Sequence, residues 1–551
     1  MARIHSLLLL LATAAPSIGV YAQLPAAPSS TNHSTSPFTL ETDDFVASLL
    51  AKFQVPGCSV AVINGEETFT KGYGFATLPD VKATPETLWF GASTTKAFVG
   101  ATLAHFVQNK TYPDVLTDGW YTPVSSIIPD DFKLSDDWAT KHINLDDAIS
   151  HRTGLPRHDY TWQYTTPNGT RTSARDIVRN LRNLAFTAEP RIAYQYSNLI
   201  YMTLSHVIET LAKKPLKTTF KELIWGPLNM TSTFLDLAEA KASPNQLATG
   251  YYWDNATQKH SAITRDYLQE AGAAGIITSV VDHAKWVRSL LYSTGPLSEN
   301  AHTDIKRPRV IAEYDPAANM TYGLYGLGWE TTTFHNETLI RHIGESLSFG
   351  SLVWWMPDRK FGVVIMSNVY KQGNFLNDVL ARHLVEDALS IPKAKRFDMA
   401  KVRRNALDEL DRAPASAVDK AFPNKPDRSI PPSASINDLV GEYHNEGYGS
   451  LVFKPTNITI TPPPTNGTSS GLALLAERPE MVYQYNVHLE HVSGDDWLAI
   501  YKSALGSRLP LEPFPSKFRL NGTAPELDIL MGYKGNGIKQ YTVTFKKVAK
   551  K

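Results

Sequence analysis

The hydrophobic residues of this 551-residue chain change their spacing several times, and each change predicts an element. A helical pattern covers about Asp43 to Phe53. Two strand-like runs follow, Ser59 to Ile63 and Thr68 to Tyr73, with Asn64-Gly65 between them. This order predicts two antiparallel strands joined by a tight hairpin turn.

The next stretch, Trp89 to Val107, ends a polar loop and begins a helix that is apolar on nearly every face, which is typical of a core helix. Ser93 falls in its first turn, so Lys96, three residues later, can reach the serine hydroxyl. A lysine in apolar surroundings loses affinity for its proton and can then activate a serine as a nucleophile. A second Ser-x-x-Lys, Ser390 to Lys393, contains Pro392, which opposes a regular helical turn, and we interpret it as chance.

Tyr196 and Asn198 lie two residues apart, just before a helical pattern that runs from Leu199 to Leu211. If the segment is extended, both side chains project to the same side. A phenol can relay a proton, and an amide can orient a lysine or a substrate carbonyl. A core tyrosine beside a helix cap explains the same pattern equally well at this point.

Further along, Thr338 to Ile343, Ser351 to Met356 and Phe361 to Ser367 predict an antiparallel meander, followed by a helix near 373–389. His342 closes the first of these strands, and Gly344 beside it would let a substrate backbone approach. Alone, such a histidine is more often an ordinary core or surface residue.

Composition narrows the function classes. The chain is 42% hydrophobic and 20% charged, with 54 basic and 54 acidic residues, so we expect a globular protein without a nucleic-acid partner. The single cysteine, Cys58, excludes an intrachain disulfide and reads as a small buried residue. His151 and His158 lie close together, but no third ligand follows at a zinc-binding spacing, so we expect neither a metal nor another cofactor.

The N-terminus predicts export. Arg3 and His5 precede an apolar run, and Val20-Tyr21-Ala22 fits a signal-peptidase site, which makes residues 1–22 a signal peptide. No later apolar run approaches the roughly 18 residues of a membrane span. We therefore expect a secreted, extracellular glycoprotein of unknown oligomeric state, because ten Asn-x-Ser/Thr sequons accompany the signal. They are Asn32, Asn109, Asn168, Asn229, Asn255, Asn319, Asn336, Asn457, Asn466 and Asn521.

Taken together, Ser93-x-x-Lys96, Tyr196-Ser197-Asn198 and His342-Ile343-Gly344 resemble the three motifs of the serine β-lactamase-like and penicillin-binding-protein superfamily. The branch with class C β-lactamases, D-Ala-D-Ala carboxypeptidases and related esterases is most similar. Further matching segments, in order, are Val55–Gly57, Ser150–Pro156, Gly226–Thr233, Tyr325–Trp329 and Val364–Asn368.

The resemblance implies an α/β (α+β) fold, in which an antiparallel sheet flanked by helices lies beside a helical subdomain and the active site lies between them. Ser93 would be acylated, and Lys96 with Tyr196 would share the general-base and general-acid steps. The N–H groups of Ser93 and of Glu345, after Gly344, would hold the oxyanion.

Two further roles follow from the same resemblance: Asn198 would orient substrate, and His342 would stand where other members have a lysine, as an electrophilic or carboxylate-binding group. Many relatives have glycine where Glu345 and Ser348 stand, so we expect a bulkier and negatively charged rim at the oxyanion site. This places binding of carboxylate-bearing β-lactams or D-Ala-terminated peptides in doubt.

The domain organisation follows from these patterns. We predict the signal peptide at 1–22, a flexible Ser/Thr/Pro spacer at 23–40, the catalytic domain at 41–390, a charged and proline-rich linker at 391–435, and a C-terminal domain at 436–551. Short strands with turn signals make the last a small β-barrel, similar to the lipocalin-like domain of some members.

The expected function is a secreted serine hydrolase that cleaves an ester or amide bond, including a lactam or D-amino-acid peptide bond, in a small-molecule or peptide substrate. Three alternatives stay open: a transesterase of secondary metabolism, an inactive scaffold on the same fold, and an α/β-hydrolase elbow at Gly467–Gly471. The last is disfavoured because Pro462-Pro463-Pro464 precedes it where a strand is required.

Overall fold

The structure is a computed structural model that describes residues 35–166, 168–263, 272–313, 320–461, 471–504, 511–520, 524–532, 534–535 and 537–549. The predicted signal peptide, most of the predicted spacer and the Gly467–Ser470 part of the elbow motif lie outside the described residues. No helix in the part of the chain that the structure describes is long and apolar enough to cross a membrane.

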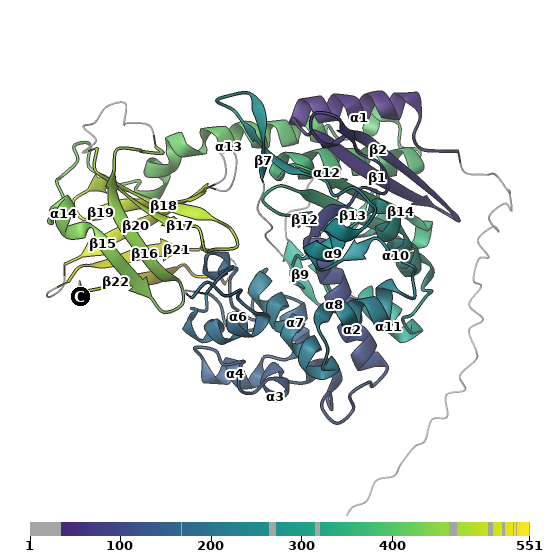
Figure 1. Cartoon of the computed structure of the whole chain (residues 1–551), viewed down its shortest axis with the longest axis horizontal. Helices are drawn as coiled ribbons and strands as arrows, with labels where there is room; N and C mark the ends of the chain where they lie inside the picture. Colours follow the sequence, from purple (N-terminus) through teal and green to yellow (C-terminus); the bar gives the residue numbers. More distant parts are fainter. Residues whose placement is uncertain are drawn as a thin grey trace, which may run out of the picture. The chain divides into compact units, whose positions relative to one another are not determined.

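A nine-stranded antiparallel sheet carries the catalytic half, in the order β3-β2-β1-β14-β13-β12-β11-β10-β9 (Figure 1). The predicted hairpin and meander are confirmed, because β1 pairs with β2 and the three meander strands pair in sequence. The strands are β1 (Gly57–Asn64), β2 (Glu67–Thr77), β3 (Val81–Lys82), β9 (Val310–Glu313), β10 (Gly323–Tyr325), β11 (Glu330–Phe334), β12 (Glu337–Glu345), β13 (Gly350–Met356) and β14 (Phe361–Ser367).

Both faces of this sheet are buried, which explains why β13 and β14 are continuous apolar runs rather than alternating ones. Along β14, Val363 and Ile365 pack with α1 (Leu40–Phe53) and α12 (Lys371–Ala388) on one face. Val364 and Met366 point the other way, into the core that α10 (Val280–Tyr292) covers. The predicted helices near 43–53 and 373–389 are therefore confirmed as the cover of one face.

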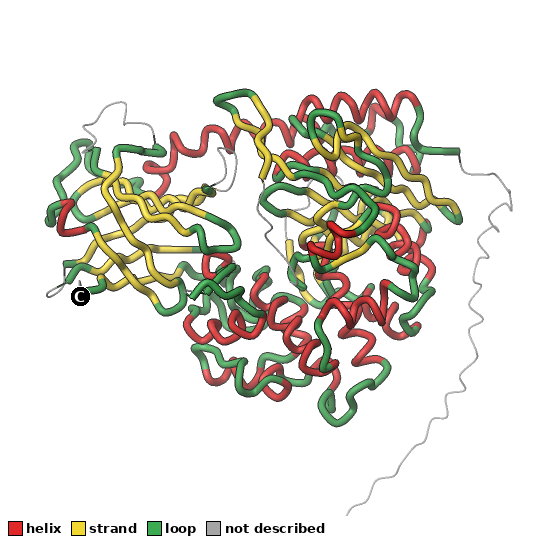
Figure 2. Tube along the Cα trace, viewed as in Figure 1, coloured by secondary structure: helices red, strands yellow, loops and turns green. Residues whose placement is uncertain are grey.

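The core that α10 covers continues into the predicted helical subdomain. Figure 2 draws the helices in red. The subdomain includes α2 (Lys96–Gln108), which is buried from Lys96 to Ala104, and α7 (Asn198–Ala212). The other helices are α3 (Val124–Ile127), α4 (Asp137–His142), α5 (Leu145–Ile149), α6 (Ala174–Asn180), α8 (Leu216–Phe220), α9 (Leu237–Ala242) and α11 (Glu299–Ile305). Two small sheets complete this half. One has three strands in the order β4 (Trp89–Ala92), β8 (Ile276–Thr278) and β5 (Thr233–Phe234). The other is the hairpin of β6 (Gly250–Asp254) and β7 (Lys259–Ile263).

The C-terminal region forms the expected barrel, closed by pairing of its first strand with its last (Figure 1). Buried aromatic side chains such as Tyr443, Trp497 and Phe545 fill its interior. Its strands are β15 (Gly441–Asn445), β16 (Gly449–Thr456), β17 (Ala473–Arg478), β18 (Tyr485–Ser493), β19 (Asp496–Ser503), β20 (Leu511–Arg519), β21 (Glu526–Met531) and β22 (Tyr541–Lys547). The short helix α14 (Ile436–Leu439) precedes it.

Within the segment predicted as a linker, the chain forms a 23-residue helix, α13 (Met399–Ala421), that contains Pro414. Met399, Leu407 and Ala417 are its buried residues. Ala417 packs with Leu498 and Ile500 of the barrel strand β19, whereas Met399 and Leu407 belong to the core of the sheet. The helix therefore connects the two parts by packing as well as by sequence.

Candidate active site

Ser93 stands at a sharp turn between the strand β4 and the helix α2. Ala92 before it adopts φ 46° and ψ −130°, a conformation that costs energy for a residue with a side chain and is often kept at functional sites. Thr95 Oγ1 secures the turn, since it donates to the Ala92 carbonyl at 2.6 Å and accepts from the Ile276 N–H at 3.0 Å. A short 3₁₀ segment, Ser93–Thr95, then leads into α2.

Lys96 is fully buried, and its Nζ has three neighbours: Ser93 Oγ at 3.2 Å, Asn198 Oδ1 at 2.8 Å and the Ala273 carbonyl at 2.7 Å. Burial and the nearby Arg157 cation hold the pKa of Lys96 well below its usual range. A neutral amine has two N–H groups, which the Asn198 and Ala273 oxygens take up as acceptors. Its lone pair is then directed at Ser93, as a general base requires.

Tyr196 lies on the other side of the serine hydroxyl and donates from Oη to Ser93 Oγ at 2.9 Å. Burial raises the pKa of this phenol, partly offset by the serine hydrogen bond and by Arg157, so Tyr196 keeps its proton at neutral pH. Ser197 is extended, with φ −137° and ψ 117°, and Asn198 begins α7. As predicted, the side chains of Tyr196 and Asn198 both reach the Ser93 and Lys96 pair.

Two neighbours of this group were missed in the sequence. The carboxylate of Asp159 accepts from Asn198 Nδ2 at 3.1 and 3.2 Å, and Arg157 donates from Nε to Asp159 at 2.8 Å. The guanidinium of Arg157 also lies over the Tyr196 ring, 5.1 Å from its centroid. Arg157 and Asp159 belong to the loop after Gly154-Leu155-Pro156, and only the tertiary fold brings that loop to the serine.

His342 lies in the interior of β12, which continues to Glu345, so the prediction that it closes this strand is wrong. Its Nδ1 lies 2.7 Å from the Ile343 carbonyl, to which it donates, and Nε2 accepts from Tyr325 Oη at 3.2 Å. Burial and Lys96 lower the pKa of His342 to about 3. The ring is therefore neutral at pH 7, with both nitrogens engaged, 6.4 Å from the Tyr196 ring. A carboxylate-binding role for it stays a prediction.

Gly344 allows β12 to lie against the strand that precedes the serine. A Cβ there would stand 2.1 Å from the Gly91 carbonyl oxygen and 2.1 Å from Ser351 Oγ, so no side chain fits. Glu345, next along, is compensated: Lys371 lies 3.3 Å from one carboxylate oxygen, and Asn374 Nδ2 lies 3.3 Å from the other. The rim that was expected to be negative thus carries an ion pair.

The two histidines considered as zinc ligands have separate partners. His151 Nδ1 accepts from the Ser197 N–H at 3.1 Å, and its ring packs 4.4 Å from the Tyr196 ring. His158 Nδ1 instead accepts from Tyr448 Oη of the barrel at 2.8 Å. Across the described ranges, no group of three His, Cys, Asp or Glu residues could hold a metal ion.

The barrel contacts the same loop that carries Arg157 and Asp159. Tyr485 Oη donates to the Tyr160 carbonyl at 3.0 Å, and the Tyr160 ring lies 4.6 Å from that of Tyr501. The Val482 N–H donates to the Trp162 carbonyl at 2.9 Å. Residues of the C-terminal domain therefore hold one wall of the site in place.

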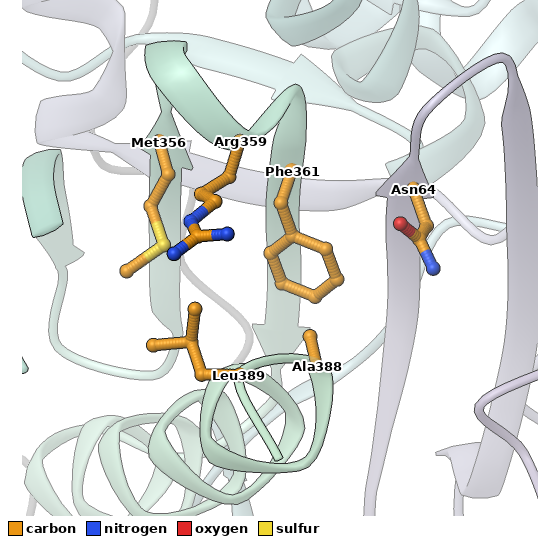
Figure 3. A pocket seen from close by; sticks show the side chains of 6 residues that line it. All are labelled: Asn64, Met356, Arg359, Phe361, Ala388 and Leu389. Carbon is orange, nitrogen blue, oxygen red and sulfur yellow. The ribbon is translucent and has the colours of Figure 1, made fainter. Parts of the chain in front are cut away.

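A surface hollow of about 180 Å³ lies elsewhere, between the β13–β14 turn and the end of α12 (Figure 3). Its lining contains one charged side chain, Arg359, which pairs with Glu337. None of the Ser93, Lys96 and Tyr196 group reaches it.

Comparisons with known proteins show which proteins the chain is similar to. The chain is 36% identical over 429 residues to the protein named "Unguisins hydrolase ungD'" of Aspergillus campestris, covering 77% of this chain and 79% of that protein. It is 33% identical over 444 residues to "Unguisins hydrolase ungD" of Aspergillus violaceofuscus, covering 77% and 78%.

Solved structures share the fold. The octameric penicillin-binding protein homologue from Pyrococcus abyssi matches 92% of this chain and 99% of its own, with a TM-score of 0.57 and 16% identity. The D-amino acid amidase from Ochrobactrum anthropi matches 63% of this chain and 99% of its own, with a TM-score of 0.52 and 19% identity. The two Aspergillus relatives carry hydrolase names. Since the beta-lactamase family profile matches residues 42–386, the chain belongs to the beta-lactamase family.

Proposed function

We propose that the protein is a serine hydrolase that cleaves an amide or ester bond through an acyl-enzyme on Ser93. The observation that carries the proposal is the position of the Ser93 hydroxyl between two proton-transfer groups. Lys96 Nζ is 3.2 Å away and Tyr196 Oη 2.9 Å away. A neutral amine on one side and a protonated phenol on the other supply the base and the acid that acyl transfer needs.

In the acylation step, Ser93 Oγ bonds to the substrate carbonyl carbon and its proton passes to Lys96. The carbonyl oxygen becomes an oxyanion, which the N–H groups of Ser93 and Glu345 would hold, each worth about 3–4 kcal/mol. Tyr196 then gives its proton to the leaving nitrogen or oxygen as that bond breaks. A proton then passes from the Lys96 ammonium to the Tyr196 phenolate, which restores both groups.

Deacylation repeats these steps with water as the nucleophile. Water bonds to the acyl carbon, and its proton passes to the Lys96 and Tyr196 pair. The ester bond to Ser93 Oγ breaks, and the serine oxygen takes back a proton from the same pair. The product carboxylic acid is released, so each turnover consumes one water and returns the enzyme unchanged.

For the substrate, we propose an amide or ester in a small molecule or peptide that has no essential free carboxylate. The two Aspergillus relatives are named unguisins hydrolases, which supports hydrolysis as the reaction. The neutral, internally bonded His342 supports the second part, because it offers no positive charge to a carboxylate.

Covalent labelling tests the proposal. A fluorophosphonate probe should phosphonylate the wild-type protein, and peptide mapping should place the adduct on Ser93. Ser93→Ala should abolish labelling, whereas Ser390→Ala, which removes the serine of the second Ser-x-x-Lys, should leave it unchanged. Labelling that persists in Ser93→Ala, or maps to Ser469, would contradict the proposal.

We further propose that the protein is secreted and glycosylated. Within the described ranges, five sequon asparagines are exposed and stand on loops or turns, as glycan acceptors must. They are Asn109, Asn168, Asn229, Asn336 and Asn457. Enzymatic deglycosylation of protein from a eukaryotic culture medium tests this: a mass decrease supports the proposal, and intracellular retention without glycan contradicts it.

A further inference from the structure

The polar side chains at the serine close into a ring of contacts that extends beyond the three family motifs. Starting from Ser93, the contacts run to Lys96, then to Asn198, to Asp159 and to Arg157. Arg157 lies over Tyr196, whose hydroxyl returns to Ser93. None of the three family motifs identified in the sequence includes Arg157 or Asp159.

The amide of Asn198 is the central link of this ring. An asparagine amide can turn so that its oxygen and nitrogen exchange places. The Asp159 carboxylate accepts hydrogen bonds only, so it requires the Nδ2 side of Asn198. The oxygen side is then left for Lys96, at 2.8 Å. Asn198 is 2% exposed, so no solvent molecule replaces a lost partner at low cost.

Arg157 contacts two members of this ring of contacts, Asp159 and Tyr196. Its Nε holds Asp159 at 2.8 Å, and its guanidinium lies 5.1 Å from the centre of the Tyr196 ring. A guanidinium above an aromatic face is attracted to it and limits how the ring can tilt. The Arg157 side chain is 60% exposed, whereas Asp159 is 16% exposed, so the cation covers the carboxylate from the solvent side.

We propose that Arg157 and Asp159 are positioning residues of this site: Asp159 orients Asn198 so that its oxygen faces Lys96, and Arg157 fixes both Asp159 and the Tyr196 ring. The inference rests on the proposed serine chemistry and adds two residues to it. Neither side chain is asked to react with substrate, because each acts through Asn198, Lys96 or Tyr196.

The pair also has an electrostatic consequence that a purely structural role would lack. The positive charge of Arg157 lowers the pKa of Lys96, and the negative charge of Asp159 raises it. Lys96 must be neutral to act as a base, so kcat/KM should fall as the pH drops below the pKa of Lys96. This falling part of the pH profile is its acid limb. Other ionisable or polarisable groups also surround Lys96 and are common to all variants. These are Tyr196, Tyr201, His151 and His342.

The test is a pH profile of kcat/KM on a p-nitrophenyl ester with the full-length protein. Arg157→Gln should move the acid limb to higher pH and Asp159→Asn should move it to lower pH, each by about one unit. Both variants should lose about 10- to 100-fold in kcat with little change in KM. Arg157→Lys should keep the wild-type limb, because it keeps the charge.

A matched control is Arg175→Gln, which removes an arginine of similar exposure from another arginine–aspartate pair, with Asp131, that shares no residue with the ring of contacts. It should leave kcat, KM and the acid limb unchanged. Limbs that fail to move, or that move in the same direction in both variants, would overturn the positioning proposal, as would activity within about 3-fold of wild type.

Phosphonylation of Ser93 separates this result from a failure of the proposed function. If the wild-type protein labels on Ser93 but the limbs do not move as stated, only the positioning proposal is wrong. If Ser93 is not labelled in the wild type, the serine mechanism itself is wrong. Asp159→Asn keeps the size and shape of the side chain. A melting temperature of this variant close to that of Arg175→Gln would show that the fold is retained.

Discussion

The hydroxyl of Tyr196 offers the sharpest single-atom perturbation of the site, because Tyr196→Phe removes one oxygen and keeps the ring. That oxygen donates to Ser93 Oγ at 2.9 Å. The ring itself is held independently, 4.4 Å from His151 and 5.1 Å below the Arg157 guanidinium. The variant should therefore keep its geometry and lose only the proton donor.

The expected magnitude follows from the role of the hydroxyl. A positioned general acid contributes about 10²- to 10⁴-fold, so kcat/KM should fall by at least about 100-fold. Stability should change by no more than about 1.5 kcal/mol, the net worth of one hydrogen bond. Because burial raises the pKa of the phenol, the wild type should keep the proton, and thus its activity, through neutral pH and above.

The assay is steady-state hydrolysis of p-nitrophenyl esters, with thermal unfolding measured in parallel. Tyr194→Phe is the matched control, since Tyr194 lies in the same segment and packs on the same His151, at 5.6 Å, but its hydroxyl is not hydrogen-bonded to Ser93 in the structure. The control should keep kcat/KM within about 3-fold. A Tyr196→Phe enzyme as active as the control would refute the assignment of Tyr196 as the acid.

Three further outcomes follow. Lys96→Ala should lower kcat by at least about 100-fold in the ester assay, because the neutral amine is the only base placed at the serine among the described residues; near-normal turnover would point to another base. His158 is buried with its pKa lowered to about 4, so the unfolded chain binds its proton first as the pH falls below 6.5. The contribution of His158 to the free energy of unfolding should therefore fall by about 2–3 kcal/mol between pH 7 and 4.5. Denaturant titrations should show a smaller loss of stability over this pH range in His158→Gln than in the wild type; an equal loss would contradict this. Glycopeptide mapping should find lower occupancy at Asn255, whose Nδ2 donates to Asp411 at 3.0 Å, than at the exposed Asn457; equal occupancy would show that this contact does not matter.

Local patterns predicted the parts of this protein that local physics determines. The Asn64-Gly65 hairpin and the buried runs of β13 and β14 were recognisable, because turn residues and apolar runs act within a few positions. The stacking of Ser93 and Lys96 likewise follows from one turn of chain. In the second Ser-x-x-Lys, which we interpreted as chance, Lys393 pairs with Glu41.

Contacts set by the tertiary fold were out of reach. The Ala273 carbonyl that binds Lys96 is a backbone atom, so no side chain marks it in the sequence. Arg157 and Asp159 are ordinary loop residues until the fold brings them to Asn198. The sequence did not predict the helix α13, because Pro414 and many charged residues in this segment are typical of a linker. The helix packs against both the sheet core and the barrel, and these contacts are set by the tertiary fold.

The central claim is that the acyl group of the substrate passes through the Ser93 oxygen. Acid quenching of the enzyme during turnover of a slowly hydrolysed p-nitrophenyl ester, followed by intact-mass and peptide-mapping measurements, tests it most directly. The account predicts a mass increase equal to the acyl group, located on Ser93 and absent from Ser93→Ala. Turnover by Ser93→Ala at the wild-type rate, or an acyl group mapped to a different residue, would contradict it.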